Sequence, residues 1–181
     1  MAEKTDSRRV RMTKRILKDS LLDLMAEKNI SHISIKEICD AADVNRSTFY
    51  AHYESPYDLL DEIENDIVGE TPRINLYKNE PILDELTAFF EYLDKNKDVC
   101  RVIYANSGAH SFETKILDKI FGKTEDKPQW ITGFDIHKDV HVKMLMSAFG
   151  GLAIVEKWIF GEIECTANDL AIAISRYIQG A

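Results

Sequence analysis

The sequence predicts an all-α fold of about nine helices, in which a head of three helices precedes a longer helical body. Apolar residues recur at three- and four-residue steps through most of the chain, which is the spacing of one helix face. Capping signals separate these segments, and no segment alternates apolar and polar residues as a half-buried strand does. We therefore expect a head over residues 1–54 and a body over residues 55–181.

The first helix is expected over about Arg9–Lys28, where five apolar residues form a single stripe. Asn29 follows, and asparagine suits the left-handed conformation that ends many helices. The stripe consists of Ile16, Leu17, Leu21, Leu24 and Met25.

Two short helices should follow, joined by a turn that is too short to reach a distant element. Ser34 with Glu37 three residues later is the pattern of a capping box, and it predicts a helix over about Ile35–Ala42. Asn45 is a favoured N-cap for the next helix. The buried face of the first short helix is expected to hold Ile35, Ile38, Cys39 and Ala42.

The body begins with a helix that Ser55 and Pro56 open, because proline is favoured at the first helical position. This helix should continue to about Glu70. The polar segment 122–133 predicts a loop. Further helices are expected over about Pro81–Leu93, Asp98–Ala105, Ser111–Phe121, Ile136–Phe160 and Thr166–Ile178.

The net charge of −8 is divided unevenly along the chain. Residues 1–53 hold ten Lys/Arg and eight Asp/Glu, whereas residues 54–181 hold thirteen and twenty-three. The N-terminal segment alone is expected to face phosphates, with the acidic body held away from them. Its seven basic residues before residue 19 are Lys4, Arg8, Arg9, Arg11, Lys14, Arg15 and Lys18.

Several classes of protein are not indicated. No signal peptide is evident, and no run approaches the ~20 apolar residues of a membrane span. Three distant cysteines, Cys39, Cys100 and Cys165, argue against a disulfide framework and favour a cytoplasmic protein. His137 and His141 have a spacing found in metal sites, but no third ligand is nearby, so neither a metal nor another cofactor is expected. No catalytic motif is present, and we do not expect an enzyme.

The second short helix carries the side chains best suited to a DNA duplex. Phe49 and Tyr53 can point to the core, which leaves its polar residues outward. Arginine can donate twice to a guanine edge, the threonine methyl can contact thymine, and Ser, Tyr and His can bind phosphates. Ser34 and Lys36 stand at a helix N-terminus, where backbone N–H groups favour a phosphate. The outward residues are Asn45, Arg46, Ser47, Thr48, Tyr50 and His52.

Residues 9–65 resemble the N-terminal domain of the TetR family of bacterial transcription regulators. The resemblance implies a helix-turn-helix head joined by a fourth helix to a body for dimerisation and ligand binding. It implies a repressor that binds a palindromic DNA operator as a homodimer and is released by a small ligand. The family's DNA-contact positions fall on Ser34, Lys36, Asn45, Arg46, Ser47, Thr48, Tyr50 and His52. The matching pieces are Ser-Ile-Lys-Glu-Ile at 34–38, Ala-Ala-Asp-Val-Asn-Arg-Ser-Thr-Phe-Tyr at 41–50, His-Tyr at 52–53 and Asp-Leu-Leu at 58–60.

Three features depart from the family pattern. Asp43 stands where the corner usually holds glycine, although aspartate tolerates a left-handed backbone. Ala51 replaces a frequent second aromatic residue, and Glu54 and Pro56 stand where lysines are often found. We expect weaker non-specific DNA binding with a shallower salt dependence. An alternative that these residues favour is a coactivator or adaptor that acts through protein contacts.

The segment Ser147–Val155, followed by Lys157-Trp158-Ile159, resembles the penultimate helix of a TetR subgroup common in Gram-positive bacteria. Small residues there allow a second helix to approach closely, and a helix this apolar must be buried. A two-fold four-helix interface with Thr166–Ile178 would bury it, and burial inside one subunit is the alternative. The expected interface residues are Met146, Phe149, Gly150, Ala153, Trp158 and Ile174.

An effector pocket is expected among the aromatic residues of the body, although aromatic residues at helical spacing also form ordinary core. The candidates are Phe89, Tyr92, Tyr104, Trp130 and Phe134.

Overall fold

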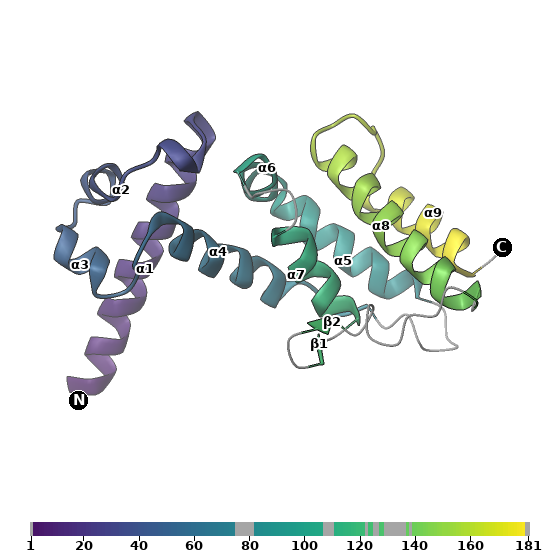
Figure 1. Ribbon diagram of the computed structural model, residues 1–181, viewed down its shortest axis with the longest axis horizontal. Helices are drawn as coiled ribbons and strands as arrows, with labels where there is room; N and C mark the ends of the chain where they lie inside the picture. Colours follow the sequence, from purple (N-terminus) through teal and green to yellow (C-terminus); the bar gives the residue numbers. More distant parts are fainter. Residues whose placement is uncertain are drawn as a thin grey trace. The chain divides into compact units, whose positions relative to one another are not determined.

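A computed structural model of the chain describes residues 2–74, 82–106, 111–121, 123–124, 127–128, 137 and 139–179. These residues form nine α-helices, one 3-10 helix and two very short strands (Figure 1). The all-α prediction is confirmed. The strands β1 (Lys123–Thr124) and β2 (Lys127–Pro128) pair antiparallel inside the segment predicted as a loop. Two residues per strand are too few to produce a recognisable alternating pattern.

The chain divides into two compact units, residues 1–67 and 68–181. The division falls later than the predicted boundary at 54/55, because most of the fourth helix packs with the first three. The elements that begin in the first unit are α1 (Ala2–Glu27), η1 (Ile30–His32), α2 (Ile35–Ala41), α3 (Arg46–Tyr50) and α4 (Pro56–Glu70).

Each of these four α-helices contributes a fully buried apolar side chain to the core of the first unit. Leu17 and Leu21 come from α1, Ile38 from α2, Phe49 from α3 and Leu59 from α4. Burying a side chain of this size stabilises a fold by about 1.5–3 kcal/mol. The three predicted helices are therefore held together, with α4 as a fourth member.

Local hydrogen bonds fix where these helices begin. The capping box of α2 is confirmed: Glu37 N donates to Ser34 Oγ at 3.3 Å, and Ser34 N donates to Glu37 Oε2 at 2.9 Å. The prediction for Asn29 is wrong, because its backbone is extended (φ −63°, ψ 142°). Its side chain instead accepts a hydrogen bond from Ser31 N at 3.0 Å and caps η1, an arrangement that needs an extended residue.

The body contains α5 (Leu83–Lys95), α6 (Lys97–Asn106), α7 (Ser111–Phe121), α8 (Asp139–Ile159) and α9 (Ala167–Gln179). Helix α5 packs along α9, and α6 contacts α8 (Figure 1). The ends of these five helices differ from the predicted ones by up to three residues. None of the described helices is long and apolar enough to cross a membrane.

Trp158 is part of the body core and not of an exposed surface. Its side chain is 1% exposed, and its ring lies edge-on to Phe90 with centroids 6.2 Å apart. The indole Nε1 donates to the carbonyl oxygen of Cys165 at 2.9 Å, and Lys97 Nζ lies 4.0 Å from the ring centroid. The prediction that Trp158 belongs to a dimer interface is therefore wrong, because its own subunit already surrounds it.

Candidate nucleic-acid interface

The turn between α2 and α3 brings these helices close together. Asp43 has a φ of 50°, and it is the one non-glycine residue with a positive φ in the part of the chain that the structure describes. Val44 N then donates to the carbonyl oxygen of Cys39 at 3.0 Å, and Ala42 is buried at the crossing. The sequence interpretation of Asp43 as the left-handed residue of this corner is confirmed.

Helix α3 has one buried side and one exposed side. Phe49 is fully buried, and its ring contacts Tyr53 with centroids 5.8 Å apart. Arg46 and Ser47 are exposed, and Tyr50 is 60% exposed. We call Arg46, Ser47 and Tyr50 the α3 surface. Of the other predicted contact residues, Asn45, Ser34 and Lys36 are exposed, whereas Thr48 and His52 are half-buried.

Three of the predicted DNA-contact residues form hydrogen bonds with one another at the N-cap of α3. Asn45 Oδ1 accepts hydrogen bonds from Thr48 N at 2.8 Å, from Thr48 Oγ1 at 2.9 Å and from Ser47 Oγ at 2.5 Å. Among the described residues, Arg46 and Tyr50 make no side-chain hydrogen bond. A base edge or a phosphate can therefore be bound by these two side chains without breaking the cap.

Ser34 and Lys36 flank a local charge pair at the start of α2. Lys28 Nζ lies 2.5 Å from Glu37 Oε1, and hydrogen bonds from Lys28 and Ser34 lower the pKa of Glu37 to about 2. Ser34 Oγ is also engaged with Glu37, at 2.8 Å. Lys36 is thus the more available of the two for a phosphate.

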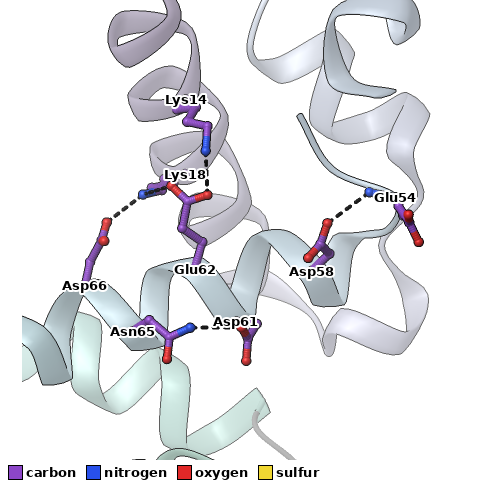
Figure 2. Close-up of polar contacts among 8 residues, drawn as sticks. All are labelled: Lys14, Lys18, Glu54, Asp58, Asp61, Glu62, Asn65 and Asp66. Atoms are coloured by element: carbon purple, nitrogen blue, oxygen red, sulfur yellow. Dashed lines mark hydrogen bonds and ion pairs between the residues drawn. The ribbon is translucent and has the colours of Figure 1, made fainter. Parts of the chain in front are cut away.

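A set of ion pairs, which we call the α1–α4 brace, links two helices of the first unit (Figure 2). Lys14 Nζ lies 2.8 Å from Glu62, and Lys18 Nζ lies 2.7 Å from Glu62 and 2.5 Å from Asp66. Burial raises the pKa of Glu62, but hydrogen bonds from both lysines outweigh it and lower this pKa to about 2. Of the seven basic residues of the N-terminal segment, Lys14 and Lys18 are thus paired with acidic residues of α4.

The start of α4 is acidic. Glu54 N donates to Asp58 Oδ2 at 3.0 Å (Figure 2), and Asp58 N donates to Ser55 Oγ at 3.2 Å. These two hydrogen bonds were not predicted, although the three-residue spacing of Ser55 and Asp58 is the signal of the second one. Glu54 is exposed, so this position offers a negative charge to any nearby phosphate.

Helix α8 has two apolar faces. Leu152, Val155 and Ile159 are buried inside the body. On the other side, Met146 is 64% exposed and Phe149 is 49% exposed. Together with exposed residues of α9, these form what we call the outer α8–α9 face: Met146, Phe149, Gly150, Ala153, Ile154, Ala173 and Tyr177.

The predicted interface residues other than Trp158 lie on this face or beside it. Four of them are exposed on α8, and the half-buried Ile174 of α9 lines a groove of about 690 Å³ between the two helices. Tyr177, which the prediction did not include, is 67% exposed next to this groove. The helical spacing of Ile174 and Tyr177 is the signal that could have found it.

The body also contains a small, partly open apolar cavity of about 70 Å³. Of the three predicted pocket residues that the structure describes, Phe89, Tyr92 and Tyr104, only Phe89 lines it. Tyr104 instead packs against Phe112, with centroids 5.3 Å apart, and Trp130 and Phe134 lie outside the described residues. Tyr92 is half-buried and does not line the cavity. The lining residues include Ile74, Leu86, Phe90, Ile116, Ile120, Ser147 and Leu152. No group of three possible metal ligands is found among the described residues.

Part of the head is similar to known regulatory proteins. Residues 19–63 match the family model described as "Bacterial regulatory proteins, tetR family". The uncharacterized HTH-type transcriptional regulator YxbF of Bacillus subtilis (strain 168) is 33% identical over 51 residues, which is 28% of this chain and 13% of that protein. The HTH-type dhaKLM operon transcriptional activator DhaS of Lactococcus lactis subsp. lactis (strain IL1403) is 27% identical over 128 residues. That alignment covers 66% of each protein.

Solved structures share the fold over nearly the whole chain. A TetR transcriptional regulator from Streptococcus agalactiae 2603V superposes with a TM-score of 0.69 at 17% identity, covering 97% of this chain and 98% of that one. A structure of the dihydroxyacetone kinase operon activator DhaS gives a TM-score of 0.57 at 21% identity, covering 93% and 94%. The chain therefore shares the overall fold of these two structures.

Proposed function

Because residues 19–63 match the model of the TetR family, we propose that this chain regulates transcription in the cytoplasm by binding a palindromic operator as a homodimer. The observation that carries this proposal is the α3 surface. Arg46 and Tyr50 stand exposed on a helix whose other side is anchored by the buried Phe49. A helix presented in this way can enter a major groove, where arginine reads guanine and tyrosine contacts a phosphate.

The other predicted contacts have supporting roles in this proposal. Lys36 and His52 supply phosphate contacts, with Ser34 at the start of α2. Asn45, Ser47 and Thr48 primarily hold the shape of α3, because they satisfy one another in the cap. Thr48 keeps its methyl group for a thymine.

The outer α8–α9 face supports the homodimer. Large apolar side chains in contact with water favour association, and a two-fold axis would place the same face on both partners. Gly150 has nothing within 4 Å of the position that a Cβ would take, so another helix can approach closely there. We also propose that the Gly150-Gly151 and Trp158-Ile159 motif marks the subgroup common in Gram-positive bacteria.

Repression by occlusion of a promoter, relieved by an effector in the apolar cavity, is our proposal for the mode of action. The cavity of about 70 Å³ must widen for this purpose, because ligand pockets usually measure about 300–1,000 Å³. DhaS, the relative named above, is a transcriptional activator, so the sign of regulation needs its own test with a reporter gene.

The test of the proposed function is selection of binding sequences from a pool of random duplexes, followed by affinity measurements on the selected duplex. We expect a sequence with two-fold symmetry. Arg46→Ala and Tyr50→Ala should each weaken binding by about 1–3 kcal/mol, whereas the exposed body variant Lys95→Ala should not.

The rival function is an adaptor that acts through protein contacts, which the acidic start of α4 favours. Failure of the selection to enrich any sequence at low salt would support this rival. Unchanged affinity in both α3 variants would instead show that α3 does not read the operator.

A further inference from the structure

Helix α1 extends well beyond the core of the head. It begins at Ala2, but its first buried residue in the described part of the chain is Leu17. With a rise of about 1.5 Å per residue, the segment before Leu17 is about 20 Å long. In Figure 1 the first turns of α1 continue past α3 and the start of α4. The core gains no buried side chain from residues 8–16, so packing alone does not explain them.

Three arginines lie along one side of this extension. Arg8, Arg11 and Arg15 are spaced by three and four residues, which places them on one helix face. We call them the α1 stripe. Arg8 and Arg11 are exposed and make no hydrogen bond or ion pair with the described residues. Arg15 is 77% exposed, and Asp19 lies 3.8 Å from it one turn later.

The α1–α4 brace does not involve the arginines of this stripe. Lys14 and Lys18 of α1 pair with Glu62 and Asp66 of α4 (Figure 2). The acids of α4 that contact α1 are thus matched by lysines, and the arginines face elsewhere. The same ion pairs fix how α1 is rotated within the unit that also contains α3.

We propose that the α1 stripe is a second DNA-contact site, which binds phosphates beside the half-site that α3 reads. This inference rests on the proposed DNA-binding function. Guanidinium groups bind phosphate oxygens through two parallel hydrogen bonds. Arg8 and Arg15 are about 10 Å apart along the helix, a length that spans about three phosphates of one strand.

The stripe compensates for the acidic start of α4. Glu54 and Asp58 stand there, and neither can hold a phosphate. Because the body is acidic, the head must supply the cations that bind DNA phosphates. The stripe supplies them within the compact unit that also contains α3. With phosphate contacts from the stripe, we expect a steeper salt dependence of DNA binding than Glu54 and Pro56 alone predict.

The test compares two double variants with equal loss of charge. Arg8→Gln/Arg11→Gln removes two cations of the stripe, and Lys95→Gln/Arg176→Gln removes two exposed cations of the body. Each protein is titrated against a 30-base-pair duplex of random sequence between about 50 and 200 mM NaCl, the range over which phosphate contacts are resolved. Thermal unfolding checks that both variants remain folded.

The stripe variant should reduce the slope of log K against log[salt] by about 2 for each bound protomer, or about 4 for the homodimer, so that the wild-type dimer loses on the order of 100-fold more affinity over this range. The body variant should keep the wild-type slope. Equal slopes in the wild type and the stripe variant would overturn the α1 site and leave the proposed function intact. If the wild type binds no duplex at low salt, both the α1 site and the proposed function would be overturned.

Discussion

The ammonium group of Lys119 on α7 lies 2.6 Å from the carbonyl oxygen of Gly69 at the end of α4, and it also donates to the carbonyl oxygen of Val68. The last carbonyl groups of a helix lack partners within the helix, and a cation there is favourable. Burial and the nearby charge of Arg73 lower the pKa of Lys119. Ile116, three residues before it, and Ile120, the next residue, line the apolar cavity. Helix α7 therefore connects the cavity wall to the end of a helix that begins in the head.

We predict that Lys119→Met loosens the last turn of α4. Methionine keeps much of the side-chain volume but has no donor, so two carbonyl groups lose a charged partner. The free energy of unfolding should fall by about 1–2 kcal/mol, measured by urea denaturation. Amide exchange at residues 68–71 should become faster. Lys119→Arg, which retains donors, should show a smaller change, and Lys95→Met should show none; equal exchange in the methionine variant and the wild type would contradict the prediction.

The α1–α4 brace predicts a loss of stability in acid. The pKa of Glu62 is lowered from its ordinary value of 4.5 to about 2 in the folded protein. Its stabilising effect is fully present above pH 4.5 and is lost as the pH falls through about 2. Glu62→Gln should flatten this part of the stability–pH curve by about 1 kcal/mol, a value reduced for solvent screening. Glu37, whose pKa is also about 2, should retain its own contribution in this variant.

Chemical denaturation between pH 2 and pH 6 measures this effect. The exposed Glu70→Gln on the same helix provides the control, and it should follow the wild-type curve. Parallel curves for Glu62→Gln and the wild type would mean that the brace does not contribute to stability.

The helix caps at Ser34 and Asn45 could be predicted because they depend on short-range signals. Ser34 with Glu37 and Asn45 with Thr48 are three residues apart, so the sequence itself places their atoms within reach. Lys14 and Glu62 are separated by 48 residues, and no periodicity predicts that pair. The prediction that Trp158 belongs to the dimer interface is wrong for another reason. Helix α8 is apolar on two faces, and spacing alone does not tell which face meets its own subunit.

We predict that Asp43→Gly stabilises the head. A φ of 50° costs an L-residue about 1 kcal/mol, and glycine adopts it freely. The midpoint of thermal unfolding should rise by a few degrees for a gain of about 0.5–1 kcal/mol. Asp40→Gly, at an exposed position inside α2, is the matched control and should destabilise by a similar amount. A lower midpoint for Asp43→Gly would show that the aspartate side chain contributes more than its backbone strain costs.

The outer α8–α9 face predicts how the homodimer can be disrupted. Ala153 lies on this face beside Phe149, and an arginine there would place a charge where the proposed partner helix packs. Ala153→Arg should convert a dimer to a monomer at micromolar concentration in sedimentation experiments. Its affinity for a two-fold operator should fall by 100-fold or more, since linked half-sites gain about 10²–10⁴ from each other.

The exposed Ala105→Arg on α6 makes the same chemical change away from the face and should leave a dimer. Both variants should remain folded, because neither side chain is buried within the subunit, and only Ala153→Arg should lower the unfolding midpoint, since it loses the stabilisation that dimerisation provides. A dimer that persists in Ala153→Arg would place the two-fold contact on another surface. The exposed Met146 and Tyr177 would then need a different partner, since side chains of this size gain little from facing water.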